Sequence, residues 1–238
     1  MQVFPIFLDV RGRSCLVAGG GAVGLEKAQR LREAGAEVVV LDPAPSAATR
    51  EFASGDPAVT IVPREFRPDD CDGRALVFAC TADDTVNAQV LEAARARGIL
   101  VQRTDGNAEA GEVGDFLGGA VLRRGELCVA VSSGGASPAF ASATRDRIAE
   151  VVGDEFGEAV AMLGQLRSRL RAEVADPLAR RRASRAVVDG GLVDLLREGR
   201  RAEAAALVAT ALDEARGPAA SRTTGEAEAA GQEARCTR

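Results

Sequence analysis

Short apolar runs alternate with amphipathic stretches along the first hundred residues of the chain. Five runs have the length and composition of buried strands, and they cover residues 14–19, 37–42, 60–66, 74–81 and 99–105. Apolar positions recur at helical spacing after the first run and after the fourth, in residues 24–35 and 84–98. Strands that alternate with helices predict a parallel sheet with helices on both faces. We therefore expect an α/β fold that begins with a Rossmann-like parallel sheet.

The pattern changes after residue 105. A polar, glycine-rich stretch leads to two apolar runs on either side of a turn, and helical patterns dominate from about residue 139. One apolar stripe with three- and four-residue steps passes through Phe156, Val160, Leu163, Leu166, Leu170 and Val174. The final stretch is poor in large apolar residues, which is typical of disordered tails. The expected organisation is a Rossmann-like domain over residues 1–112, a small α+β segment over 113–148, a helical domain over 149–216 and a disordered tail over 217–238.

Composition narrows the possible chemistry. The chain has 238 residues, a formal net charge of -5 and no histidine. Without histidine there is no Ser-His-Asp triad and the commonest metal ligand is missing, so we expect no metal site on the protein. Acid–base work then falls to carboxylates, lysine, cysteine or hydroxyl groups. The mild acidity disfavours nucleic acid as a partner.

Cysteine usage and hydropathy bear on the cellular location. The five cysteines include no C-x-x-C pair, which favours free thiols in a reducing compartment. No signal-peptide pattern opens the chain, and no apolar run approaches the roughly 18 residues that span a bilayer. We expect a cytoplasmic protein with no membrane partner.

A glycine motif lies between the first expected strand and the first helix. Gly19, Gly21 and Gly24 form G-x-G-x-x-G. The first glycine permits a tight turn, the second lets the backbone approach a pyrophosphate, and the third lets helix and strand pack closely. Asp42 ends the next strand, where a carboxylate accepts hydrogen bonds from ribose hydroxyls and repels a 2′-phosphate, so NAD is favoured over NADP. The alternative is a glycine-rich turn that binds nothing.

Polar residues end the later strands, at the edge where open α/β sheets bind ligands. Thr81 and Asp83 follow the fourth strand, and Asp83 has a helix cap as its alternative role. Asp105 ends the fifth strand and is the candidate base in a chain without histidine, with an Asx turn into Gly106 as its alternative role. The residues expected to contact the cofactor are Gly19, Gly21, Ala22, Val23, Gly24, Asp42, Pro43, Thr81 and Asp83.

A second distinctive stretch, SSGGASP, leads from an expected strand into a helix. It gathers free backbone N–H groups, hydroxyl groups and a helix N-terminus, which together form an anion receptor. Helix capping by Ser137 is the alternative, although a cap alone does not account for the two serines and two glycines before it. The expected substrate-binding residues are Ser132, Ser133, Gly134, Gly135 and Ser137.

Taken together, four motifs resemble the precorrin-2 dehydrogenase/sirohydrochlorin ferrochelatase family, the N-terminal module of siroheme synthase. They are PIFLDVRGRSCLVAGGGAVGLEKA, TADDTVN, VAVSSGGASP and GQLRSRLR. The resemblance extends over about residues 1–215. It implies NAD-dependent oxidation of precorrin-2 to sirohydrochlorin, followed in many members by insertion of ferrous iron, a substrate, to give siroheme.

The resemblance also assigns roles to particular residues. The essential aspartate of the family falls on Asp105, as base in the oxidation and participant in chelation, and a serine that lines the tetrapyrrole site falls on Ser133. Members are homodimers whose helical parts interlock, so residues 113–148 are expected to serve dimerisation and the substrate site.

The chain departs from the family pattern in two places. Gln102-Arg103-Thr104-Asp105 stands where Asn-Val-x-Asp is frequent, and Gly118-Gly119 replaces the usual proline. Two other functions stay open at this point. One is a dehydrogenase that leaves chelation to a separate enzyme, and the other is a non-catalytic module that senses NAD or a tetrapyrrole.

Overall fold

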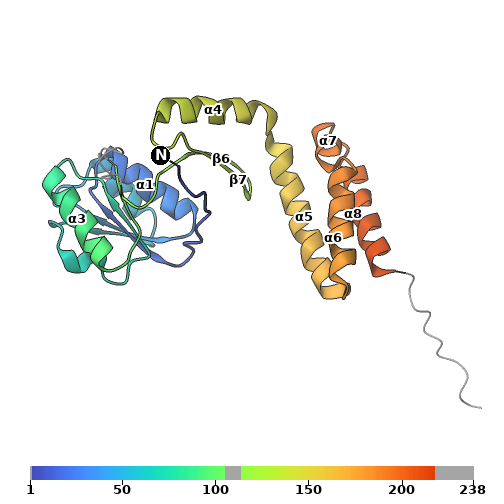
Figure 1. The fold of residues 1–238 in the computed structure, drawn as a ribbon, viewed down its shortest axis with the longest axis horizontal. Helices are drawn as coiled ribbons and strands as arrows, with labels where there is room; N and C mark the ends of the chain where they lie inside the picture. The colour runs from blue at the N-terminus through green and yellow to red at the C-terminus, as the bar shows by residue number, and fades with distance from the viewer. Residues whose placement is uncertain (1, 105–113, 218–238) are drawn as a thin grey trace, which may run out of the picture. The chain divides into compact units, whose positions relative to one another are not determined.

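The structure, a computed structural model, describes residues 2–104 and 114–217 (Figure 1). Two compact units are present. The first comprises the described residues of Met1–Ala120 and Ala130–Arg145, and the second those of Val121–Val129 and Asp146–Arg238. Asp105 and the tail expected from its composition to be disordered lie outside the described residues, apart from Gly217.

Five parallel strands form the sheet of the first unit, in the order β3-β2-β1-β4-β5. The strands are β1 (Ser14–Ala18), β2 (Glu37–Leu41), β3 (Val59–Val62), β4 (Leu76–Ala79) and β5 (Val101–Arg103). The order changes direction between β1 and β4, which creates a topological switch point at their carboxyl ends. Ala18 of β1 lies opposite Leu41 of β2 and Ala79 of β4, so three strands end side by side at this point.

Helices cover both faces of this sheet because alternate strand residues point to opposite sides. On one face, Val17 of β1 packs in a cluster with Ala28 and Leu31 of α1 (Ala22–Glu33). α2 (Ala47–Ser54) adds Phe52 to the same cluster. On the other face, Leu16 packs in a cluster with residues of α3 (Asp84–Ala96) and of the short 3-10 helix η1 (Pro68–Cys71).

A two-stranded ribbon and a helix follow the sheet. The ribbon consists of β6 (Ala120–Arg124) and β7 (Leu127–Val131), and the helix is α4 (Pro138–Val151). All three elements contribute residues to both compact units.

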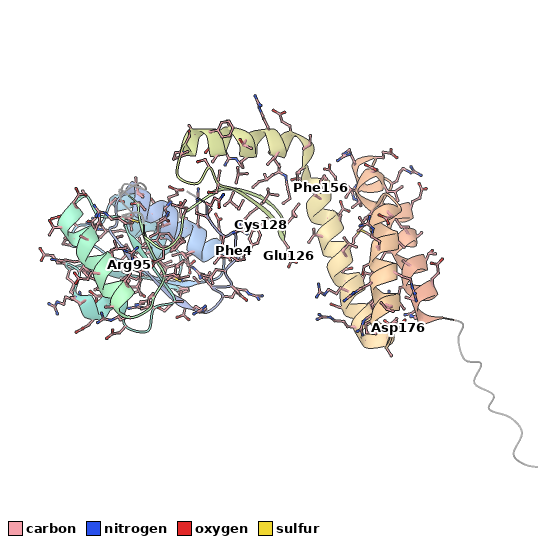
Figure 2. The ribbon with its side chains drawn as sticks, viewed as in Figure 1. Phe4, Arg95, Glu126, Cys128, Phe156 and Asp176 are labelled. Atoms are coloured by element: carbon pink, nitrogen blue, oxygen red, sulfur yellow. The ribbon has the colours of Figure 1, made fainter. Side chains whose placement is uncertain are left out.

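Among the described residues, four helices lie wholly within the second unit and share one core. They are α5 (Asp154–Glu173), α6 (Pro177–Asp189), α7 (Leu192–Arg197) and α8 (Arg201–Arg216). Leu166 and Leu170 of α5 pack in this core with residues of the other three helices. Asp176 begins α6 by accepting hydrogen bonds from the N–H groups of Leu178 and Ala179, and Phe156 lies near the other end of α5 (Figure 2).

The fold class expected from the sequence is confirmed, although some details differ. The sequence pattern did not predict α2 and η1, because each is too short to show an apolar period. The third strand ends at Val62 rather than at residue 66, since Pro63 has no N–H group to continue the ladder. The helical region after residue 139 is interrupted at Val152-Gly153, between α4 and α5.

Candidate functional site

The glycine turn at the switch point requires glycine at two positions. Gly19 has a φ of +112°, and a Cβ there would lie 2.5 Å from the carbonyl oxygen of Cys80. A Cβ on Gly24 would collide with the carbonyl oxygen of Gly19. The turn therefore packs against β4 on one side and against the first turn of α1 on the other, as the motif predicts.

The outer side of the turn is open. A Cβ built on Gly21 meets nothing within 4 Å, and Gly21 is the N-cap of α1 without a side chain that caps the helix. Ala22 and Val23 are exposed in the first helical turn, and Val23 keeps 46% of its surface accessible. Exposed backbone N–H groups at a helix N-terminus attract anions. An open, glycine-lined cradle with this donor set fits the pyrophosphate of a dinucleotide.

Asp42 lies directly beside this turn, at the end of β2. Its Oδ2 accepts a hydrogen bond from Gly20 N at 2.6 Å, and its Oδ1 accepts one from Ala44 N at 2.7 Å. The carboxylate is therefore fixed by two backbone donors, and each oxygen keeps a further lone pair for another donor. Pro43 is exposed beside it.

The β4–α3 connection holds Thr81 and Asp83 in place. Thr81 N donates to Oδ1 of the buried Asn87 at 3.0 Å, and Asn87 Nδ2 donates to the carbonyl of Thr81 at 2.9 Å. Asp83 caps α3 through Oδ1, which accepts from Thr85 N at 2.8 Å. Asp83 therefore fills the capping role, and its contact with a cofactor stays a prediction.

The end of β5 carries two residues next to Asp105, which itself lies outside the described residues. Thr104 donates from both its N–H and its hydroxyl to the carbonyl of Ala79, at 3.1 and 3.2 Å. The Arg103 guanidinium pairs with Asp84 at 3.0 Å, and its side chain is only 12% exposed. These contacts anchor the chain to β4 and α3 at the position immediately before Asp105.

The chain resumes at the other end of β5. Asp115 N donates to the carbonyl of Val101 at 2.7 Å, and Val101 N donates to Asp115 Oδ2 at 3.1 Å. Arg95, which Figure 2 labels, donates from Nε to Oδ1 of the same carboxylate at 3.0 Å. Thus both ends of the segment that contains Asp105 are attached to β5 or its neighbours.

In the SSGGASP stretch, each serine side chain bonds to a backbone group of the same loop or of the start of α4. Ser133 Oγ accepts from Ser137 N at 2.9 Å and donates to the Ser137 carbonyl at 3.0 Å. Ser132 Oγ accepts from Gly134 N, and Ser137 Oγ caps α4 by accepting from Phe140 N. Gly134 and Gly135 have φ values of +63° and +86°, which glycine adopts without strain. The stretch thus combines the expected cap with a folded loop before it.

The described residues offer few groups for other chemistry. Cys15 lies in β1, the strand that leads into the glycine turn. Burial raises the pKa of its thiol to about 11, so the thiol stays protonated at neutral pH and is no nucleophile. In the part of the chain that the structure describes, no three His, Cys, Asp or Glu side chains gather as metal ligands would. Among the same residues, no helix is both long and apolar enough to cross a membrane.

The structure also reveals two residues that the sequence analysis did not single out. Ser46, the N-cap of α2, and Thr49, in the first turn of that helix, contact the back of the glycine turn, where Thr49 Oγ1 donates to the carbonyl of Gly20 at 2.8 Å. The one available signal was Ser46 three residues before Thr49, a spacing typical of helix N-caps.

Comparison with known proteins gives three family models in succession along the chain. An NAD(P)-binding model matches residues 6–117, the sirohaem biosynthesis protein central model matches residues 124–150, and the sirohaem synthase dimerisation region matches residues 155–212.

Individual proteins agree with this order. A siroheme synthase of Methylococcus capsulatus is 35% identical over 215 residues, which are 90% of this chain and 44% of that protein. Siroheme synthase 2 of Klebsiella pneumoniae is 38% identical over 184 residues, which are 76% of this chain and 39% of that protein. The chain thus spans less than half the length of these curated relatives.

The fold itself has a solved counterpart. The structure of SirC, described as a precorrin-2 dehydrogenase, superposes with a TM-score of 0.69 at 19% identity, over 89% of this chain and 100% of that one. The successive NAD(P)-binding, central and dimerisation regions place the chain in the siroheme synthase family, as its N-terminal module.

Proposed function

We propose that this chain oxidises precorrin-2 to sirohydrochlorin with NAD and then inserts ferrous iron to give siroheme. The observation that carries the proposal is the glycine turn at the switch point, in a chain that aligns with siroheme synthases over 215 residues. The chain is an NAD(P)-binding protein by its family match, and the choice of NAD over NADP belongs to the proposal.

Backbone groups of the turn would hold the dinucleotide. Gly19, Gly21 and Gly24 shape the cradle, the N-terminus of α1 at Ala22 and Val23 faces the phosphates, and Asp42 disfavours a 2′-phosphate by charge repulsion. Pro43, Thr81 and Asp83 border the same edge. When bound, NAD⁺ accepts the hydride that leaves precorrin-2.

A base must take the proton that leaves precorrin-2 together with this hydride. We assign this role to Asp105, since it follows directly after the anchored Thr104 at the carboxyl end of the sheet. During chelation, ferrous iron enters as substrate and two N–H protons leave the macrocycle, and the same carboxylate can accept a proton at that step.

The substrate carries many carboxylates and needs donors that recognise anions. Ser132, Ser133, Gly134, Gly135 and Ser137 form the expected contact. The place of the loop supports this role, because it lies directly before the N-terminus of α4, where a helix attracts anions, while the N–H groups of Gly134, Ala136 and Ser137 are used in bonds within the loop.

We further propose that the chain works as a homodimer. It contains a dimerisation region over residues 155–212. The parts proposed for this assembly are a nucleotide domain over residues 1–112, a dimerisation and substrate-site segment over 113–148 and a helical domain over 149–216. Sedimentation velocity of the purified chain should give twice the monomer mass of 24.6 kDa.

The test of activity is anaerobic incubation with precorrin-2 and NAD, followed by addition of ferrous iron. We expect NADH and sirohydrochlorin to form, and siroheme to appear faster than without protein. In Asp105→Asn, which keeps the shape and loses the base, NADH formation should fall by about 100-fold or more, while the Kd for NADH stays within about twofold. Asp69→Asn, at a side chain 90% exposed, is the matched control and should behave like wild type.

Each deviation has a defined meaning. Oxidation without accelerated iron insertion would identify a dehydrogenase that relies on a separate chelatase. Binding of NADH with neither reaction would reject the enzymatic proposal in favour of a sensing module. Unchanged oxidation in Asp105→Asn would remove the base from that residue.

A further inference from the structure

Gly20, the middle residue of the glycine turn, is held on its inner side by the segment that follows β2. Its N–H donates to Asp42 Oδ2 at 2.6 Å, and its carbonyl accepts from Thr49 Oγ1 at 2.8 Å and from Ser46 N at 3.0 Å. Gly20 is buried, and a Cβ there would lie 2.8 Å from Cβ of Pro45. Both peptide groups of this residue are therefore fixed from behind.

Thr49 is the buried centre of these contacts. Thr49 is 0% exposed, and its Oγ1 lies 2.8 Å from Ser46 Oγ. A hydroxyl has one proton, and Thr49 donates that proton to Gly20, so Ser46 is the donor between the two hydroxyls. Ser46 Oγ in turn accepts from Thr49 N at 3.1 Å. Hydroxyl groups linked in this way polarise each other and strengthen the final bond to the Gly20 carbonyl.

Fixing the Gly20 carbonyl also fixes the next N–H group. In a trans peptide the C=O of one residue and the N–H of the following residue point in opposite directions. The Gly20 carbonyl points to Thr49, so Gly21 N–H points to the opposite, outer side of the turn. That side is open, since nothing lies within 4 Å of a Cβ built on Gly21.

We propose that Thr49 is a positioning residue for the nucleotide, which orients Gly21 N–H toward the pyrophosphate through the Gly20 carbonyl. This inference rests on the proposed binding of NAD. Loss of the Thr49 hydroxyl leaves Ser46 N as the remaining donor to that carbonyl, so the peptide can tilt and the phosphate loses a directed hydrogen bond. The effect belongs to the diphosphate part of the ligand and spares the adenosine part.

The test compares Thr49→Val, which keeps the shape and removes the hydroxyl, with Thr49→Ser, which restores it. The full chain is titrated with NADH, and binding is measured from the fluorescence of NADH. ADP-ribose and adenosine are then added as competitors, and their Kd values are obtained from the displacement of NADH. Thr49→Val should raise the Kd for NADH and for ADP-ribose about tenfold, and leave that for adenosine within about twofold. Thr49→Ser should bind within about twofold of wild type. Ser54→Ala is the matched control, because Ser54 is an exposed residue at the end of the same helix and its Oγ donates to the local Glu51 carbonyl.

The outcomes separate this inference from the function beneath it. Wild-type chain that fails to bind NADH overturns the proposed function and this inference with it. If wild type and Thr49→Val bind NADH with the same Kd, the positioning role alone is overturned. The same holds if Thr49→Val weakens the binding of adenosine as much as that of ADP-ribose, or if Thr49→Ser does not restore the wild-type Kd. If Thr49→Val fails to fold by circular dichroism, Ser46→Ala takes its place, with an expected increase of about threefold in the Kd for NADH. An unchanged Kd in that variant overturns the proposal.

Discussion

At the scale of single residues, Gly21 and Gly24 differ although both belong to one motif. Gly21 has an ordinary φ of −79° and open space around it, whereas Gly24 touches the carbonyl of Gly19. The same alanine substitution therefore acts on different states of the protein. At Gly24 it disturbs the folded chain itself, whereas at Gly21 the added methyl group meets open space in the chain and would contact only the proposed nucleotide.

This contrast leads to a prediction for two alanine variants. Gly24→Ala should lower the free energy of unfolding by about 1–3 kcal/mol and weaken NADH binding, because the turn must move to make room. For Gly21→Ala, the free energy of unfolding should stay within about 0.5 kcal/mol of wild type. NADH binding should still weaken by about tenfold, since the methyl group occupies the space through which the pyrophosphate approaches. Urea denaturation and NADH titration measure both quantities. Equal binding of wild type and Gly21→Ala would place the phosphates elsewhere.

The sequence predicted the residues of this turn better than the contacts behind it. The geometry at Gly19 and Gly24 was identified because it follows from backbone requirements that the motif records, whereas the contact of Asp42 with a ribose stays a prediction. Thr49 was missed because its role depends on a helix of eight residues, too short for a periodic pattern, that packs against a turn 29 residues earlier. Long-range contacts of this kind leave no local signal. The roles of Asp105 as base and of the SSGGASP stretch as substrate contact still rest on the sequence.

At the scale of elements, ion pairs fix the irregular connections of the first unit. Before β4, the Arg64 guanidinium binds both oxygens of Asp70 in η1, at 2.9 and 2.6 Å, and Arg67 N donates to the same carboxylate at 2.8 Å. The side chain of Asp70 is 12% exposed. The Arg64 guanidinium, more than any other group, holds the pKa of this carboxyl below its usual range. Because the folded state prefers the ionised form, Asp70 stabilises the fold at pH values above the unfolded-state pKa, about 4.

Asp70→Asn should therefore cost stability that depends on pH. At pH 7 we expect a loss of about 1–2 kcal/mol in the free energy of unfolding, since the amide can accept one of these bonds and leaves Arg64 without its charged partner. The difference from wild type should shrink as the pH falls below about 4 and through the lowered folded pKa, where the wild-type carboxyl is also neutral. Urea denaturation at a series of pH values measures this difference. A constant difference at all pH values would show that Asp70 acts by shape alone.

At the scale of the whole molecule, each of the two compact units is stabilised by its own buried side chains. The sheet of the first unit is packed on both faces, and the helices of the second unit pack around Leu166, Leu170, Leu192 and Leu212. The NAD(P)-binding match and the dimerisation match fall on different cores. The strand–helix alternation predicted the first core, and the stripe through Leu166 and Leu170 predicted one face of the second. The pairing of helices within the second core could not be derived, because one stripe does not reveal its partners.

Separate cores predict separate thermal behaviour. Leu170→Ala should destabilise the helical unit by about 2–5 kcal/mol and lower its transition temperature, while the Kd for NADH stays unchanged. Leu16→Ala, at an equally buried leucine of β1, is the converse control. It should lower the transition temperature of the first unit and weaken NADH binding. Differential scanning calorimetry at fixed protein concentration resolves the two transitions. A single transition that shifts equally in both variants would show that the units unfold together.

In the helical unit, three ion pairs join residues that lie 42 or 43 positions apart in the chain. α5 pairs with later helices through Glu155–Arg197, Glu158–Arg201 and Glu173–Arg216, with separations of 42, 43 and 43 residues. The two pairs with α8 advance along both helices together, so α5 runs parallel to α8, with α6 as the return. Deleting a single residue within α8 would rotate every residue after the deletion by about 100° around the helix axis, and Arg216 would turn away from Glu173. The number of residues in this stretch is thus constrained more strictly than their identity, so length variation should be rare here even where the sequence is free to drift.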